Sequence, residues 1–306
     1  MAFQARGSIR RKGSHLVVTL VYVDDLLITG TNLKLIEQVR KDLQVRFKMK
    51  DLGELKYFLG IEFSRSKKGI QMCQRNYALE LVSELGLLGG KPVTTPLEFN
   101  HKLTSMEFNK VVTKNGSDND NELEDKGKYQ RIVGILLYLT MTRTDIAFVV
   151  QVLSQFMHAP KQSHMTAAKR VIRYIKGTPG LGLFMPAEGN MKLTACCDSD
   201  WGVCVETRRS VTGYVIKFGE ALISQKSKKQ GTVSRSSVEA EFRSMATTVA
   251  EVTWLTGLFR ELNIEVEVPI HLFCDSKAAI QIAVHPIFHE RTKHIDIDCH
   301  FVREKI

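Results

Sequence analysis

The sequence lacks the patterns that mark several common protein classes. Its six cysteines form no Cys-x-x-Cys pair, which excludes the usual zinc and dithiol redox motifs. It holds no glycine-rich phosphate loop and no Ser or Cys nucleophile elbow. No stretch reaches the roughly 18 uninterrupted apolar residues of a membrane span, and no apolar block follows the basic N-terminal residues as in a secretory signal. We therefore expect an intracellular protein, cytoplasmic or nuclear, with reduced core thiols and no membrane contact.

The composition is that of a folded, basic protein. With 306 residues, 43% of them hydrophobic and 25% charged, the chain is long enough for two domains that each bury a core. Lysine and arginine number 43 against 33 aspartate and glutamate residues, which leaves a formal charge of +10. This surplus favours polyanionic partners, so nucleic acid is the first candidate.

Local patterns predict hairpins and helices in the N-terminal part. Residues 16–30 are β-branched and aliphatic on both sides of a paired acid, which predicts strand, tight turn and strand. Apolar side chains spaced by three and four residues predict a helix over 33–47, after a cap at Thr31-Asn32. Further on, we expect a strand with alternating side chains over 55–63, a turn at 66–69 and a helix over 76–88.

In the rest of the chain, the spacing of apolar residues changes twice. Residues 91–128 are broken by prolines and rich in polar side chains, so they are expected to form a linker. Helical periodicity then gives way to antiparallel strands and finally to alternating helix and strand, which indicates an α/β fold with a mixed sheet. The expected helices are 129–142, 145–157, 163–176, 236–262, 276–284 and 289–305, and the expected strands are 191–198, 211–218, 220–226 and 268–274.

Two adjacent aspartates, Asp24 and Asp25, occupy the expected turn that follows Tyr22-Val23. Neighbouring carboxylates repel each other unless a divalent cation intervenes, so the pair is a candidate metal site. The alternative is an ordinary Asx turn. The aromatic-Val-Asp-Asp quartet between two apolar strands is much rarer than a lone Asp-Asp, which favours the metal site.

Three further acids are placed to converge on one edge of the mixed sheet. Asp198 and Asp275 each end an apolar strand, and Glu241 lies beside the apolar stripe of the long helix, whereas Glu239 is turned off it. Three carboxylates so placed can hold two divalent ions about 4 Å apart and cleave a phosphodiester. The alternative is three unrelated surface acids. The order strand-Asp, helix-Glu, strand-Asp favours the first interpretation.

Other groups have plainer interpretations. Trp201 and Trp254 are more simply core residues than base-stacking groups. A basic stripe on the helix 163–176 is more simply a solvated face than a phosphate contact, and consists of Lys169, Arg170, Arg173 and Lys176. Pro286 interrupts one cluster of zinc-like residue types, so no zinc is expected at His285, His289, His294, Cys299 and His300.

Several blocks of the sequence resemble the Pol polyprotein of copia-type retrotransposons. YVDD, LLITG and MKDLGELKYFLGIEF are similar to the metal-binding hairpin and following segment of its reverse transcriptase, an RNA-directed DNA polymerase. Phe58, Leu59 and Gly60 resemble the element laid against the primer backbone. CCDSDWGVCVETRRSVTGY, LISQKSKKQGTVSRSSVEAEF, LFCDSKAAI and FHERTKHIDI are similar to its ribonuclease H. The resemblance runs from His15 to Ile306.

The resemblance implies a domain division and a chemistry. Residues 1–90 would form part of an α+β reverse-transcriptase palm and thumb, and residues 91–128 would form the linker. Residues 129–185 would form a helical connection. Residues 186–306 would form a ribonuclease H-like domain that lacks its last strand and its fourth acid. Magnesium would be the cofactor, and RNA, DNA or an RNA:DNA hybrid the partner. The implied ligands are Asp24 and Asp25 in the polymerase and Asp198, Glu241 and Asp275 in the nuclease, with phosphate contacts from Lys226, Lys228, Lys229 and Arg235.

Present activity is a separate matter, on which three hypotheses compete. The chain is a working nuclease, a catalytically inert nucleic-acid-binding remnant of a decayed element, or a poorly folded product. Polymerase activity by this chain alone is the least expected, because none of the 23 residues before Asp24 is Asp or Glu. Asp296 and Asp298 are interpreted as helix-surface acids. A sheet without its last strand would expose an edge and lower solubility.

Overall fold

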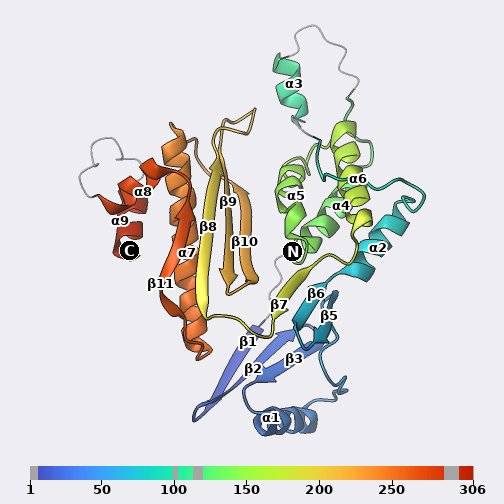
Figure 1. Ribbon diagram of the computed structural model, residues 1–306. Coiled ribbons are helices and arrows are strands. Elements are labelled where there is room, and N and C mark those ends of the chain that lie inside the picture. The colour runs from blue at the N-terminus through green and yellow to red at the C-terminus, as the bar shows by residue number, and fades with distance from the viewer. Residues whose placement is uncertain (1–5, 99–102, 113–119, 286–295, 306) are drawn as a thin grey trace.

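The fold begins with a three-stranded antiparallel sheet and one helix (Figure 1). The computed structural model describes residues 6–98, 103–112, 120–285 and 296–305. The strands β1 (Arg6–Lys12), β2 (His15–Tyr22) and β3 (Asp25–Gly30) are consecutive neighbours. Helix α1 (Leu33–Arg46) packs on them through a small core of Val17, Leu35 and Val39. The Asn32 side chain accepts a hydrogen bond from the Leu35 N–H at 3.2 Å, which confirms the predicted cap.

A second antiparallel sheet joins segments far apart in the sequence. Its strands are β4 (Tyr57–Phe58), β5 (Ile61–Ser66), β6 (Gly69–Cys73) and β7 (Leu183–Pro186), in that order. The predicted strand over 55–63 is interrupted, because Leu59 and Gly60 have φ of +50° and +72° and form a tight turn between β4 and β5. The predicted turn at 66–69 is confirmed.

A helical body lies between β6 and β7 in the chain. It consists of α2 (Arg75–Glu84), α4 (Lys126–Leu139), the 3-10 turn Thr144–Ile146, α5 (Ala147–Ser154) and α6 (Gln162–Gly177), which share one hydrophobic core. The predicted linker is more ordered than expected, since it contains α3 (Met106–Val112), and Leu97 and Leu103 pack against the same core. Residues before and after the linker therefore contribute to one core, and the division at residues 90 and 129 stays a prediction.

The basic stripe of α6 holds the segment that follows α2. Lys176 Nζ donates to the carbonyl oxygens of Leu87 at 3.2 Å and Gly90 at 2.7 Å. Arg173 Nε donates to the Lys91 carbonyl oxygen at 2.9 Å, and Arg170 pairs with Glu98 at 2.9 Å. The interpretation as a solvated face is thus wrong for most of the stripe. Lys176 and Arg173 donate hydrogen bonds to backbone carbonyl groups of a segment that has no helix or strand partner for them.

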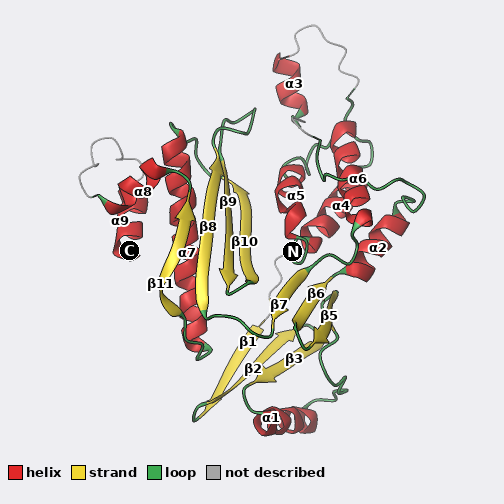
Figure 2. Cartoon of the chain, viewed as in Figure 1, coloured by secondary structure: helices red, strands yellow, loops and turns green. Residues whose placement is uncertain are grey.

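The C-terminal half forms the predicted mixed sheet. Strands β8 (Lys192–Asp200), β9 (Val211–Phe218) and β10 (Ala221–Lys229) are antiparallel, and β11 (Glu267–Cys274) adds parallel to β8, in the order β10-β9-β8-β11. The long helix α7 (Ser237–Glu261) lies along one face, with α8 (Lys277–Val284) and α9 (Asp296–Lys305) beside it (Figure 2). On the β10 side, Gln225 Nε2 donates to the Thr140 carbonyl oxygen at 3.2 Å and so links the sheet to the helical body.

Two expectations about individual residue types fail. Trp201 and Trp254 are 54% and 61% exposed, so neither packs in the core. All six cysteines are free thiols, but only Cys197 and Cys299 are buried, and Cys196 is exposed. Among the described helices, none combines the length and apolarity that crossing a bilayer requires.

Candidate functional site

Parallel pairing of β8 and β11 brings two of the predicted acids to one sheet edge. Cys197 of β8 lies opposite Cys274 of β11, so the residues that follow them, Asp198 and Asp275, lie at the same level of the sheet. Asp275 follows the end of β11, but Asp198 lies within β8 and pairs with Gly213 of β9, so the prediction that Asp198 ends its strand is wrong. Both aspartates are exposed. Because parallel strands end at the same edge, the strand pattern alone predicts this meeting once the pairing is known.

Glu241, in the first turns of α7, lies close to Asp275, whereas Asp198 is not part of the close group of ligand atoms in the described residues. Ser236 caps this helix by accepting a hydrogen bond from the Glu239 N–H at 3.2 Å. Glu241 is 8% exposed, and its Oε2 is buried without a hydrogen-bond partner. Three potential ligand atoms lie within 4.8 Å of one another, one from each of Glu241, Cys274 and Asp275. This is the only such group of three in the described part of the chain.

The electrostatics of this group are those of acids held close together. The pKa of Glu241 is raised to about 7, first by burial and then by the negative charges of Asp198 and Asp275, against a backbone hydrogen bond from Ser199 that lowers it. Burial and Asp198 also raise the pKa of Asp200. Repulsion of this kind is what a divalent cation removes. A buried carboxylate oxygen without a donor, beside two exposed aspartates, therefore fits magnesium.

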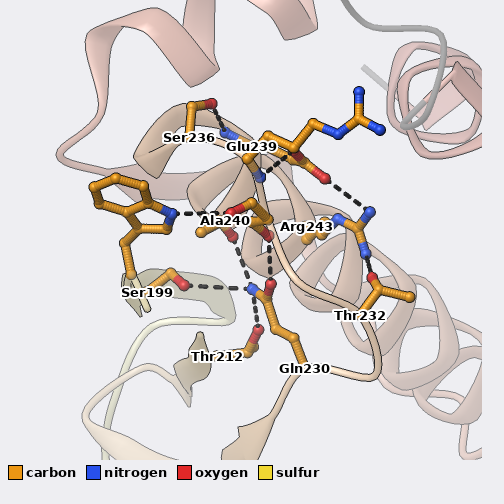
Figure 3. A network of polar contacts seen from close by, with 11 residues as sticks. Ser199, Thr212, Gln230, Thr232, Ser236, Glu239, Ala240 and Arg243 are labelled. Atoms are coloured by element: carbon orange, nitrogen blue, oxygen red, sulfur yellow. Dashed lines mark hydrogen bonds and ion pairs between the residues drawn. The ribbon is translucent and has the colours of Figure 1, made fainter. Parts of the chain in front are cut away.

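A buried network fixes α7 against the sheet, and sequence reasoning missed it (Figure 3). Gln230, which is 8% exposed, donates from Nε2 to Thr212 Oγ1 at 3.1 Å, to Ser199 Oγ at 3.3 Å and to the Ala240 carbonyl oxygen at 3.0 Å. Its Oε1 accepts from Ser234 Oγ at 2.9 Å. A glutamine after a strand carries no sequence signal for this role, because its partners belong to three separate elements.

Two more residues near the acids are buried for structural reasons. Glu239 is 3% exposed, although the helical phase had turned it off the apolar stripe. It accepts hydrogen bonds from the Arg235 N–H at 2.7 Å and from Arg243 Nη2 at 2.8 Å, so its charge is paired (Figure 3). Ser244 donates from Oγ to the Asp198 carbonyl oxygen at 2.7 Å, which links α7 directly to β8 at this acid.

The polymerase-like acids lie at a hairpin tip. Asp24 and Asp25 are both exposed, and Tyr22 pairs with Asp25 across the turn. Val23 has φ of +49°, a backbone conformation that strains a β-branched residue. Within the described residues, no group of three metal-ligating side chains forms around this pair.

The hairpin of Phe58, Leu59 and Gly60 lies against α4. The Tyr138 hydroxyl donates to the Leu59 carbonyl oxygen. A Cβ added at Gly60 would meet the Tyr138 ring at 3.2 Å. Burial raises the pKa of Tyr138, and so do Tyr77, Tyr57 and Tyr22, so this ring lies near both polymerase-like elements.

The predicted phosphate-contacting residues do not form one cluster. Lys226, Lys228 and Lys229 line a cleft of about 480 Å³ between β10, α7 and α9, whereas Arg235 is exposed in the loop before α7. Lys229 Nζ donates to Gln155 Oε1 at 2.6 Å, so it is tied to α5. Asp298, interpreted as a helix-surface acid, lies on α9, lines the same cleft and is half-buried, and burial raises its pKa.

His289 and His294 lie outside the described residues, as do most of the residues of the FHERTKHIDI block. The side chain of Asp296 also lies outside the described part.

Comparison with known proteins gives consistent matches. Residues 5–99 match the family model described as reverse transcriptase (RNA-dependent DNA polymerase). The retrovirus-related Pol polyprotein from transposon RE1 of Arabidopsis thaliana is 41% identical over 97% of this chain and 20% of its own length. The corresponding polyprotein from transposon TNT 1-94 of Nicotiana tabacum is 33% identical over 96% of this chain and 22% of its own length.

A shorter relative covers most of its own sequence. An uncharacterised mitochondrial protein of Arabidopsis thaliana is 41% identical over 77% of this chain and 92% of its own length. The chain spans about a fifth of the length of the Pol polyproteins that it matches. No solved structure matches it.

Proposed function

This chain belongs to the copia-type retrotransposon Pol family, with a reverse-transcriptase-like segment at residues 5–99, and we propose that residues 186–306 act as a ribonuclease H. The proposed reaction is magnesium-dependent cleavage of the RNA strand of an RNA:DNA hybrid. Asp198, Glu241 and Asp275 are the proposed metal ligands. The observation that carries the proposal is the buried Glu241 Oε2, which lacks a hydrogen-bond donor beside two other carboxylates.

Each residue of the site has a definable task. Asp198 would bind metal from within β8 and Asp275 from the end of β11, and Glu241 would bind it from α7 after giving up the proton that its raised pKa favours. When bound, magnesium supplies an activated water molecule and charge stabilisation at the leaving oxygen. Gln230 and Ser244 position the elements that carry these acids.

Substrate binding would use the basic surface beside the sheet. Lys226 and Lys228 line the cleft next to α7, and Arg235 is exposed near the N-terminus of that helix. Such cations attract phosphate groups regardless of base sequence, so affinity for a hybrid should fall as salt rises.

The reverse-transcriptase-like segment is assigned a lesser role. We propose that Asp24 and Asp25 are polymerase-type metal ligands and that Phe58, Leu59 and Gly60 contact the primer backbone. Because no third metal-ligating side chain joins the Asp24-Asp25 pair within the described residues, this chain alone is not expected to extend a primer.

A cleavage assay on an RNA:DNA hybrid tests the nuclease proposal. Asp198→Asn, Glu241→Gln and Asp275→Asn should each lower the magnesium-dependent rate at least about 100-fold, because each removes charge that holds the metal. Glu265→Gln, which changes an exposed acid outside the group, should cleave as the unchanged chain does. Full activity of the triple variant would overturn the proposal. Salt-dependent binding of the hybrid without cleavage would favour the inert nucleic-acid-binding remnant instead.

A further inference from the structure

A thiol lies among the carboxylates of the proposed site. Cys274 is the last residue of β11, and its Sγ is within 4.8 Å of a carboxylate oxygen of Glu241 and one of Asp275. The thiol is half-buried and directly precedes Asp275 in the chain. The three ligand atoms therefore come from one strand end and from the helix that crosses it.

A separate observation, independent of the thiol, points to a cation at this position. Glu241 is 8% exposed, and its Oε2 finds no hydrogen-bond donor in the protein. A buried polar oxygen without a donor is costly and rare, and a bound metal ion satisfies it.

The donor set suits a softer metal than magnesium. Magnesium and calcium prefer oxygen ligands, so Cys274 would add nothing to a magnesium site. Zinc accepts thiolate sulfur together with carboxylate oxygen, at bonds of about 2.3 Å and about 2.1 Å, so two tetrahedral ligands are about 3.6 Å apart. Ligand atoms already within 4.8 Å reach that separation by side-chain rotation. Three protein ligands leave the fourth position open to water.

We propose that Glu241, Cys274 and Asp275 form a zinc site that overlaps the proposed magnesium site. Zinc bonds to the sulfur as the thiol proton leaves to solvent, and no oxidant or reductant is needed. Because the two metals share Glu241 and Asp275, zinc competes with magnesium. The prediction that zinc inhibits hybrid cleavage rests on the proposed function. The prediction that zinc binds does not rest on it.

The neighbouring cysteines supply the controls. Cys197 lies opposite Cys274 on β8, and the two thiols share a hydrogen bond, so Cys197→Ser tests the adjacent sulfur. Cys196 is exposed, points to the opposite face of β8 from Cys197, and is not part of the group of three ligand atoms, so Cys196→Ser removes a thiol outside the proposed zinc ligands.

Cobalt(II) added to the full chain tests zinc binding without using activity. A cobalt-thiolate bond gives a near-ultraviolet charge-transfer band, which we expect in the unchanged chain and in the Cys196→Ser and Cys197→Ser variants. Cys274→Ser should lose the band while its circular dichroism remains that of a folded protein. Zinc added in equal amount should displace the cobalt. A band that persists in Cys274→Ser, or its absence from the folded unchanged chain, would overturn the site.

Competition and inhibition test the overlap. Glu241→Gln and Asp275→Asn should weaken cobalt binding at least about tenfold. Excess magnesium should weaken it in the unchanged chain, and a cobalt titration insensitive to magnesium would overturn the shared ligands. In the cleavage assay, zinc should inhibit Cys274→Ser less than Cys196→Ser, each relative to its own zinc-free rate. Absence of hybrid cleavage would contradict the proposed function. The cobalt spectrum of the same chain would still test whether the zinc site exists.

Discussion

The side-chain amide of Gln230 donates from Nε2 to the carbonyl oxygen of Ala240 at 3.0 Å. Ala240 directly precedes Glu241, and the same nitrogen is 3.3 Å from the hydroxyl of Ser199, which directly follows Asp198. One buried amide after β10 therefore ties together the helix and the strand that carry two of the proposed ligands (Figure 3). The relative position of those two acids depends on this link.

Replacing Gln230 by alanine should destabilise the protein. The change leaves the Ala240 carbonyl and the hydroxyls of Ser199 and Thr212 without this donor in a buried region, so the free energy of unfolding should fall by about 2–4 kcal/mol. Urea denaturation measures the loss. Gln281→Ala, at an exposed position in α8, is the matched control and should change stability by less than about 0.5 kcal/mol. Equal effects of the two substitutions would contradict the role given to Gln230.

The pKa of Glu241 predicts a pH dependence of stability. It is raised from its ordinary value of 4.5 to about 7, first by burial and then by Asp198 and Asp275. The folded chain therefore binds this proton more tightly than the unfolded chain does. The stabilisation is fully present below about pH 4.5 and is lost as pH rises through 7, by at most about 3 kcal/mol.

Glu241→Gln removes this titration. Unfolding free energies should be measured from about pH 5 to about pH 8 with divalent cations chelated, and the variant should gain stability over the unchanged chain as pH rises. Glu265→Gln, at an exposed position, should keep the original profile. Parallel profiles for Glu241→Gln and the unchanged chain would show that this carboxyl group is not perturbed.

The turn that carries Asp24 and Asp25 should gain stability when its strain is removed. Val23 has φ of +49° and is 80% exposed, so Val23→Gly relieves the backbone and gives up little burial. We expect the free energy of unfolding to rise by about 0.5–1 kcal/mol in thermal or urea denaturation. Val45→Gly, at an equally exposed position within α1, should instead lower it by about 0.3–0.5 kcal/mol. A loss of stability in Val23→Gly would contradict the strain.

Lys176 should control local opening of the segment after α2. Its ammonium group donates to the carbonyl oxygens of Leu87 and Gly90, so Lys176→Ala should speed hydrogen exchange of the amides over 86–98. Lys169→Ala changes an exposed lysine of the same helix and should leave that exchange unchanged. Identical exchange in the two variants would show that the segment is held by other contacts.

Most helices and strands follow from the sequence because their signals are local. Apolar spacing and a capping residue predict α1, and β-branched runs predict β2, β3 and the strands of the mixed sheet. The interruption at Leu59-Gly60 was missed because alternation continues through it, and only the positive φ angles reveal the turn. Trp201 and Trp254 were misjudged because residue type alone does not fix exposure.

The sequence by itself determined which acids could serve as metal ligands, since residue type and position on a strand or helix are local properties. Only the tertiary structure decided what surrounds them. Packing of α7 on the mixed sheet sets Glu241 beside Cys274 and Asp275, and Gln230 reaches Ser199 and Ala240 from a different segment. Such contacts join residues far apart in the chain, and the spacing of residues along one segment carries no information about which distant segment will pack against it.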